Sequence, residues 1–256
     1  MRDKLTLLFI LTMMFVINKT NAQQNVVTTN DSINKFEKDS IVKFEFGGSN
    51  YSVSKYIPRS GTQVGQGIAN QTLAFISYSN LSTYFWLNYG FPDKRITEVD
   101  YGIEYEYKLA VDFLKGSWNI KAGAHNYIFP VPDLSNFILE GSLLYKGVIE
   151  SDLLYTYCFK SKKIDSGSRL YFEIRKPFKL ILAKIKTLFY PTLSSAYHFG
   201  FYGWEGFGHI TPGVKLKVNL SHCSINTFLK YQISSNDIIK GYTKPKFLYG
   251  GLGIEF

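Results

Sequence analysis

The sequence predicts an all-β protein, a transmembrane antiparallel up-and-down β-barrel of about twelve strands. Three observations indicate this class: an N-terminal secretory segment, recurring runs of alternating apolar and polar residues, and a last run that ends on Phe256. Side chains in a strand point alternately to opposite faces. In a membrane barrel one of those faces contacts lipid and the other lines the interior.

The first residues have the features of an export signal. Arg2 and Lys4 precede an apolar run over 5–17, and Ala22 ends a stretch of small residues that suits cleavage. The run is too short to span a bilayer as a helix, and its flanks are those of a secretory signal peptide. We therefore expect a signal peptide over 1–22, a polar periplasmic lead-in over 23–40 and the barrel over 41–256.

Composition favours a barrel over a soluble globule. Aromatic residues make up 17% of the chain, yet the mean hydropathy is only -0.06. A lipid-facing half, aromatic girdles at both membrane interfaces and a polar interior together produce such an average. An aromatic-rich periplasmic β-sandwich is the alternative.

Twelve alternating runs are separated by turn residues. The expected strands are 41–48, 71–78, 82–91, 98–109, 118–128, 137–146, 149–159, 168–177, 187–201, 213–220, 224–233 and 246–256. An even number places both termini on the periplasmic side, where most connections are short. The outer connections, such as 49–70 and 202–212, are mostly longer. Segment 178–186 breaks the pattern and fits a long turn, a strand extension or a short amphipathic helix.

Charged residues identify the interior face. In 98–109, Tyr101 and Ile103 alternate with Glu104 and Glu106. A basic side chain facing lipid near the midplane costs about 2–4 kcal/mol, so the charged face should line the interior. The same reasoning, which leaves the facing of 71–78 open, predicts an interior of mixed sign lined by Glu104, Glu106, Lys108, Lys121, His125, Arg169, Glu173, Arg175, Lys215 and Lys217.

The pairing register between two strands can also be predicted. A turn centred between positions 113 and 114 places Glu106 opposite Lys121 and Gly102 opposite His125. A slip of one residue would send Lys121 into lipid, so the charge pattern protects this register. We expect Glu106 and Lys121 to be cross-strand neighbours inside the barrel.

Several short segments together resemble the TorF-type porins of Gram-negative bacteria. The segments are 56–61 (YIPRSG), 98–102 (EVDYG), 118–123 (WNIKAG) and 127–130 (YIFP), followed by strand-like stretches at 140–142, 154–157 and 170–173. The resemblance covers most of the chain after the signal and departs at 178–186. It implies a barrel in the cell outer membrane and, less directly, pore formation.

The residues do not assemble into a recognisable catalytic or metal site. Ser194 and His198 share a strand face but lie about 13 Å apart at ~3.3 Å per residue, too far to hydrogen-bond. His125 near Glu104 and Glu106 could form an acid–base cluster or a metal site, although a carboxylate-lined interior explains the same residues and is the preferred interpretation. Cys158 and Cys223 fall at opposite ends of the barrel and should be free thiols. We therefore expect no enzyme activity, no cofactor and no metal.

The net charge of +9 does not indicate nucleic-acid binding, because export removes that partner. Outer-membrane lipids, lipopolysaccharide and the barrel-assembly machinery are the expected partners, and Phe256 is the candidate assembly signal. A generic lipid-facing role for Phe256 remains the alternative.

The expected function is a narrow passive channel for small solutes, since about twelve strands enclose far less space than the 16–18 of wide porins. The alternatives are a structural or adhesion barrel plugged by its own side chains and, third, a lipid-modifying enzyme.

Overall fold

The computed structural model describes residues 44–65, 67–109, 116–130, 135–182, 185–239 and 243–256. The predicted signal peptide and periplasmic lead-in lie outside these residues, as does the predicted turn centre at 113 and 114. No helix in the described part of the chain is long and apolar enough to cross a membrane.

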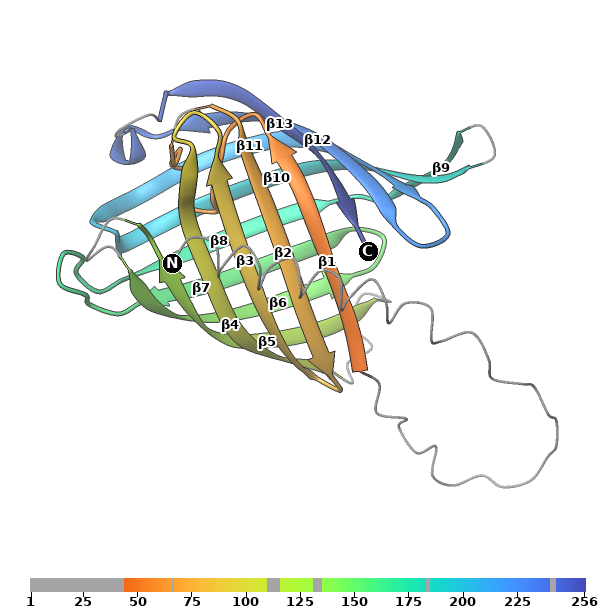
Figure 1. Cartoon of the computed structure of the whole chain (residues 1–256), viewed down its shortest axis with the longest axis horizontal. Helices are drawn as coiled ribbons and strands as arrows, with labels where there is room; N and C mark the ends of the chain where they lie inside the picture. The colour runs from red at the N-terminus through yellow and green to blue at the C-terminus, as the bar shows by residue number, and fades with distance from the viewer. Residues whose placement is uncertain (1–43, 66, 110–115, 131–134, 183–184, 240–242) are drawn as a thin grey trace. The chain divides into compact units, whose positions relative to one another are not determined.

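The described residues form thirteen strands and one short 3-10 helix (Figure 1). They are β1 (Phe44–Val53), β2 (Ala69–Tyr78), β3 (Leu81–Gly90), β4 (Arg95–Leu109), β5 (Ser117–Ile128), β6 (Asn136–Lys146), β7 (Glu150–Cys158), β8 (Gly167–Arg175), β9 (Phe178–Leu182), β10 (Ile185–Phe201), β11 (Trp204–Asn219), β12 (Ser224–Ser234), η2 (Asn236–Ile238) and β13 (Lys246–Glu255).

The sheet closes on itself. Every pairing is antiparallel, β1 pairs with both β2 and β13, and β10 pairs with both β8 and β11. Figure 1 shows β13 beside β1, where the first and last strands meet. Because β9 continues the line of β8 along β10, the ring contains twelve strands, and the predicted twelve-strand antiparallel barrel is confirmed.

Segment 178–186, whose structure the sequence left open, begins as a strand extension. Lys176 donates its backbone N–H to the Pro191 carbonyl at 3.2 Å, and β9 then resumes pairing with the first residues of β10. Pro177 has no backbone N–H, which accounts for the break between β8 and β9. β9 and the first residues of β10 project from the barrel at the end where the chain finishes (Figure 1).

The predicted outer loop over 202–212 is wrong. β10 and β11 are joined by Tyr202 and Gly203 alone, and both residues have positive φ angles, 54° and 73°. Both Gly206, with φ of 89°, and Pro212 lie within β11. A register shift occurs between Ala196 and Tyr197, so this part of the wall contains a β-bulge.

The two faces of the wall differ in polarity. Along β4, Tyr101 and Ile103 are 45% and 48% exposed on the outer face, whereas Glu98 and Asp100 are 3% and 8% exposed on the inner face. An apolar exterior around a charged interior is the arrangement that a lipid-embedded barrel requires.

The facing of β2, which the sequence left open, follows from its neighbours. Leu73 and Phe75 line the same cavity as Glu255, so they point inward. Thr72 points outward, and its hydroxyl accepts a hydrogen bond of 2.8 Å from Asn50. Each face of β2 carries both kinds of residue, because Gln71 lies on the inner face with Leu73, and Tyr78 on the outer face with Thr72, so the strand has no clean alternation.

The end where β1 begins and β13 finishes is called the proximal end, and the opposite one the distal end. Cys158 ends β7 at the distal end and Cys223 lies in the proximal β11–β12 turn, and both cysteines are free, as expected. At the proximal end, Phe256 and Gly48 exchange two backbone hydrogen bonds of 2.9 and 3.0 Å.

Replacing Phe256 by Ser should lower the amount of assembled barrel several-fold. The side chain is 47% exposed, so burial alone accounts for no more than ~1.5–3 kcal/mol, and recognition during assembly would account for the larger loss. The readout is the fraction of membrane-embedded protein that migrates in its folded form in SDS before heating. Phe256→Tyr keeps an aromatic terminus and should assemble normally. Normal assembly of Phe256→Ser would contradict the assembly-signal prediction.

Candidate functional site

The connection between β1 and β2 turns into the barrel. We call segment 54–65 the inward loop. Its residues Tyr56, Ser60 and Thr62 are 7%, 4% and 6% exposed, which is unusual for a connection between strands. Val64 donates its N–H to the Tyr56 carbonyl at 3.0 Å, and Gly61 donates to the Pro58 carbonyl at 2.9 Å. These bonds make the inward loop a tight hairpin.

Three side chains on adjacent strands hold the tip of the inward loop. His209 Nε2 (β11) lies 3.3 Å from the Arg59 carbonyl, and His198 Nε2 (β10) lies 3.1 Å from the Ser60 carbonyl. Gln232 (β12) donates a hydrogen bond from its side-chain amide to the Gly61 carbonyl. We call His198, His209 and Gln232 the loop anchor. Each is at most 3% exposed.

The chemistry of the loop anchor assigns the protons. A carbonyl oxygen can only accept, so both histidines donate through Nε2. His209 Nδ1 then accepts from the Thr211 hydroxyl at 2.9 Å. His198 therefore hydrogen-bonds to the inward loop and not to Ser194.

Glycine is required at the anchored tip. Gly61 has φ of 85°, a region that side chains disfavour. A Cβ atom on Gly61 would lie 2.2 Å from the ring of His209. The close approach of backbone to ring therefore depends on the missing side chain.

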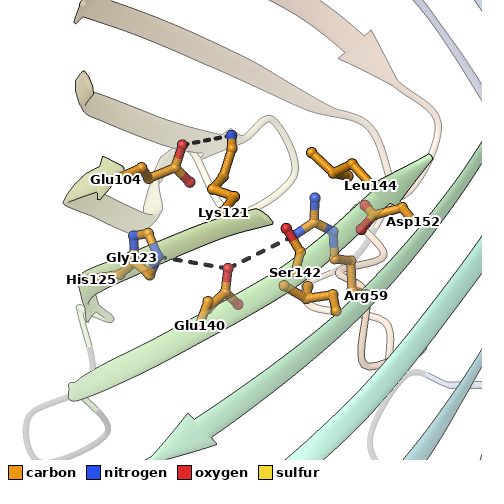
Figure 2. Close-up of a pocket in the computed structure, with 10 residues that line it drawn as sticks. Arg59, Glu104, Lys121, Gly123, His125, Glu140, Ser142, Leu144 and Asp152 are labelled. Carbon is orange, nitrogen blue, oxygen red and sulfur yellow. Dashed lines mark hydrogen bonds and ion pairs between the residues drawn. The ribbon is translucent and has the colours of Figure 1, made fainter. Parts of the chain in front are cut away.

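On the side away from the loop anchor, Arg59 reaches β6. Its Nη1 lies 3.8 Å from Glu140 Oε2, and this ion pair is drawn in Figure 2. Glu140 is also 3.6 Å from Arg169 Nη2 and 3.7 Å from His125 Nε2, and it accepts a 3.0 Å hydrogen bond from Thr156. The Glu140 carboxylate, whose side chain is 10% exposed, thus contacts one residue of the inward loop and one residue on each of three other strands.

The predicted register between β4 and β5 is confirmed. Glu106 is the Cα partner of Lys121, and Gly102 is that of His125. The side chains pair diagonally, however: Lys121 Nζ bonds Glu104 at 2.9 Å, while Glu106 accepts from Asn119. Asn119 occupies the acceptor that Lys121 was expected to use.

The other residues predicted to line the interior form separate groups. Glu173 lies 3.3 Å from Lys230 and 3.7 Å from Arg175, and Arg175 also pairs with Glu150. Nearer the proximal end, Lys215 and Lys217 lie 3.6 and 2.7 Å from Glu255. Lys108 is exposed on β4, opposite Asn119.

The sequence-based list of site residues omitted Arg59 and Glu140, the two groups that meet across the interior. Glu140 could have been found from alternation, since it follows the outward Leu139 on β6. Arg59 could not, because the period-two pattern does not determine the direction of a loop.

A cavity lies beside Arg59 (Figure 2). Its volume is about 70 Å³. Charges of both signs and two leucines contribute to its lining, which consists of Arg59, Glu104, Lys121, Gly123, His125, Glu140, Ser142, Leu144, Asp152 and Leu154. Within the described residues, no group of three or more His, Cys, Asp or Glu side chains is arranged to hold a metal ion.

Comparison with solved structures identifies the fold. The NanC porin superposes with a TM-score of 0.51 at 11% sequence identity, over 83% of this chain and 99% of that chain. The KdgM porin, solved in complex with disordered oligogalacturonate, gives 0.48 at 12% identity, over 82% and 97% of the two chains. The chain has the fold of a porin-like outer-membrane β-barrel. No protein-family model and no curated protein matches it, so the TorF-type resemblance is not confirmed.

Removing the charge of Glu140 should destabilise the barrel. Glu140→Leu leaves Arg169, whose side chain is 5% exposed, without its carboxylate, and breaking a buried ion pair from one side costs about 3–5 kcal/mol. Urea unfolding of the protein in lipid vesicles measures the loss. Glu106→Gln, which changes a partly exposed carboxylate, should cost less than about 1 kcal/mol. Equal stability of the two variants would contradict the central role of Glu140.

Proposed function

We propose that the protein is a narrow passive channel for small solutes in the cell outer membrane, with the inward loop at its narrowest level. The observation that carries this proposal is the double attachment of the loop tip. The loop anchor holds its carbonyls on one side, and Arg59 pairs with Glu140 on the other. A solute crossing the barrel would have to pass between the inward loop and the wall.

The charged interior supports passage of polar solutes. Acidic and basic groups occur at the level of the inward loop and again near the proximal end, where Glu255 pairs with Lys217. The apolar exterior suits outer-membrane lipids and lipopolysaccharide as neighbours, and assembly would use the barrel-assembly machinery. A relationship to TorF-type porins is the finer family proposal, based on segments such as 56–61.

A second candidate function is a plugged barrel that acts structurally through its surface loops. A specific observation favours it: Ile138, Cys158, Ile164 and Phe201 form a buried apolar cluster towards the distal end, with Tyr202 and other aromatic side chains packed against it. Such a cluster excludes water from part of the interior. Ion conduction separates the two candidates.

Single-channel recording in planar bilayers tests the channel proposal. The native protein should show small, stable unit currents. The double variant His198→Ala with Gln232→Ala removes two of the three contacts that hold the inward loop, and its unit conductance should rise at least twofold because the loop can leave the narrow level. Both proteins should first be shown to keep the folded form in SDS.

The matched control is His222→Ala, in the proximal turn between β11 and β12, which should conduct like the native protein. A folded native protein that carries no current, together with a silent double variant, would contradict the channel and favour the plugged barrel.

A further inference from the structure

The cavity beside Arg59 contains one cationic and one anionic group with unused hydrogen-bonding capacity. The Arg59 side chain is 50% exposed, and its ion-pair contact, Glu140 Oε2, is 3.8 Å away, which is beyond hydrogen-bond distance. Asp152 Oδ1 is buried and has no hydrogen-bond partner among the described residues. Figure 2 shows both side chains directed into the same space, Arg59 from the inward loop and Asp152 from β7.

The other charges that line the cavity are already compensated. Glu104 bonds Lys121 at 2.9 Å. Glu140 has Arg169 at 3.6 Å and a hydrogen bond from Thr156. Arg59 and Asp152 attract each other electrostatically, but Asp152 Oδ1 has no hydrogen-bond partner among the described residues and Arg59 has only the longer contact to Glu140. Hydrogen bonds to both groups are therefore open to a ligand.

We propose that this cavity binds small zwitterionic solutes, of which short-chain α-amino acids are the type. This inference rests on the proposed channel function and names its solute class. The solute carboxylate accepts from the paired N–H donors of Arg59, and its ammonium group donates to Asp152. Both contacts form in a partly water-excluded interior, where charge interactions are stronger than in bulk water.

Other classes of solute fit the same charges less well. A simple anion would pair with Arg59 but be repelled by the negative charge of Asp152. A simple cation would pair with Asp152 but be repelled by the positive charge of Arg59. A neutral polyol would displace water from both charged groups without replacing their electrostatic partners. Only a solute carrying both charges satisfies the two groups at once.

The remaining lining limits solute size. Leu144 and Leu154 offer a short apolar surface, and Gly123 and Ser142 add little bulk. The cavity volume of about 70 Å³, against about 10–15 Å³ for one water molecule on the same measure, suits a molecule of a few heavy atoms. Alanine is therefore a suitable probe.

Titration calorimetry on the folded full-length protein in detergent tests the inference without requiring ion conduction. Alanine should bind saturably, and acetate, methylammonium and glycerol should each bind at least tenfold more weakly. Asp152→Asn and Arg59→Gln should each weaken alanine binding at least tenfold. The control Lys160→Gln, at an exposed distal position outside the cavity, should leave binding unchanged.

Several results would overturn the inference. Acetate binding as tight as alanine binding would indicate an anion site, and equal binding of glycerol would indicate a polyol site. Absence of saturable alanine binding would reject the zwitterion site, while currents in planar bilayers would still support the channel. If a variant does not fold, the comparison of the four solutes on the native protein decides the question.

Discussion

The antiparallel pairing of β1 with β13 is the constraint on which the rest of the structure depends. In lipid, unpaired backbone groups are costly, so a membrane sheet has to close. Closure then gives every strand one inner and one outer face, and period-two alternation sorts the residues between them. The exposed Tyr101 and the buried Glu98 on the same strand result from this single requirement.

Closure also creates the space into which the inward loop folds. Because β10, β11 and β12 are neighbours in the ring, His198, His209 and Gln232 present donors side by side to three successive carbonyls. Arg59 can then reach Glu140 on β6. The barrel interior at the inward loop therefore has a hydrogen-bonded side and a charged side, and the proposed solute cavity lies on the charged one.

The sequence predicted the barrel and much of its interior because those features follow from local periodicity. The pairing of Glu106 with Lys121 followed from charge alternation and an assumed turn centre between positions 113 and 114. Other features depend on tertiary contacts with no local signature. The direction of segment 54–65 was not predictable from alternation, and the bulge after Ala196 together with Gly206 concealed the true length of β11. Lys121 bonds Glu104 instead of Glu106 because Asn119 donates to the Glu106 carboxylate.

The most direct test of the constriction is chemical modification of a cysteine placed at its tip. In a background with Cys158→Ser and Cys223→Ser, the variant Arg59→Cys is treated with a bulky trimethylammonium thiol reagent while single-channel current is recorded. The account predicts a loss of most of the current, whereas the same reagent on Lys160→Cys, at the distal surface, leaves the current unchanged. Full labelling at position 59 with undiminished current would contradict a narrow level formed by the inward loop.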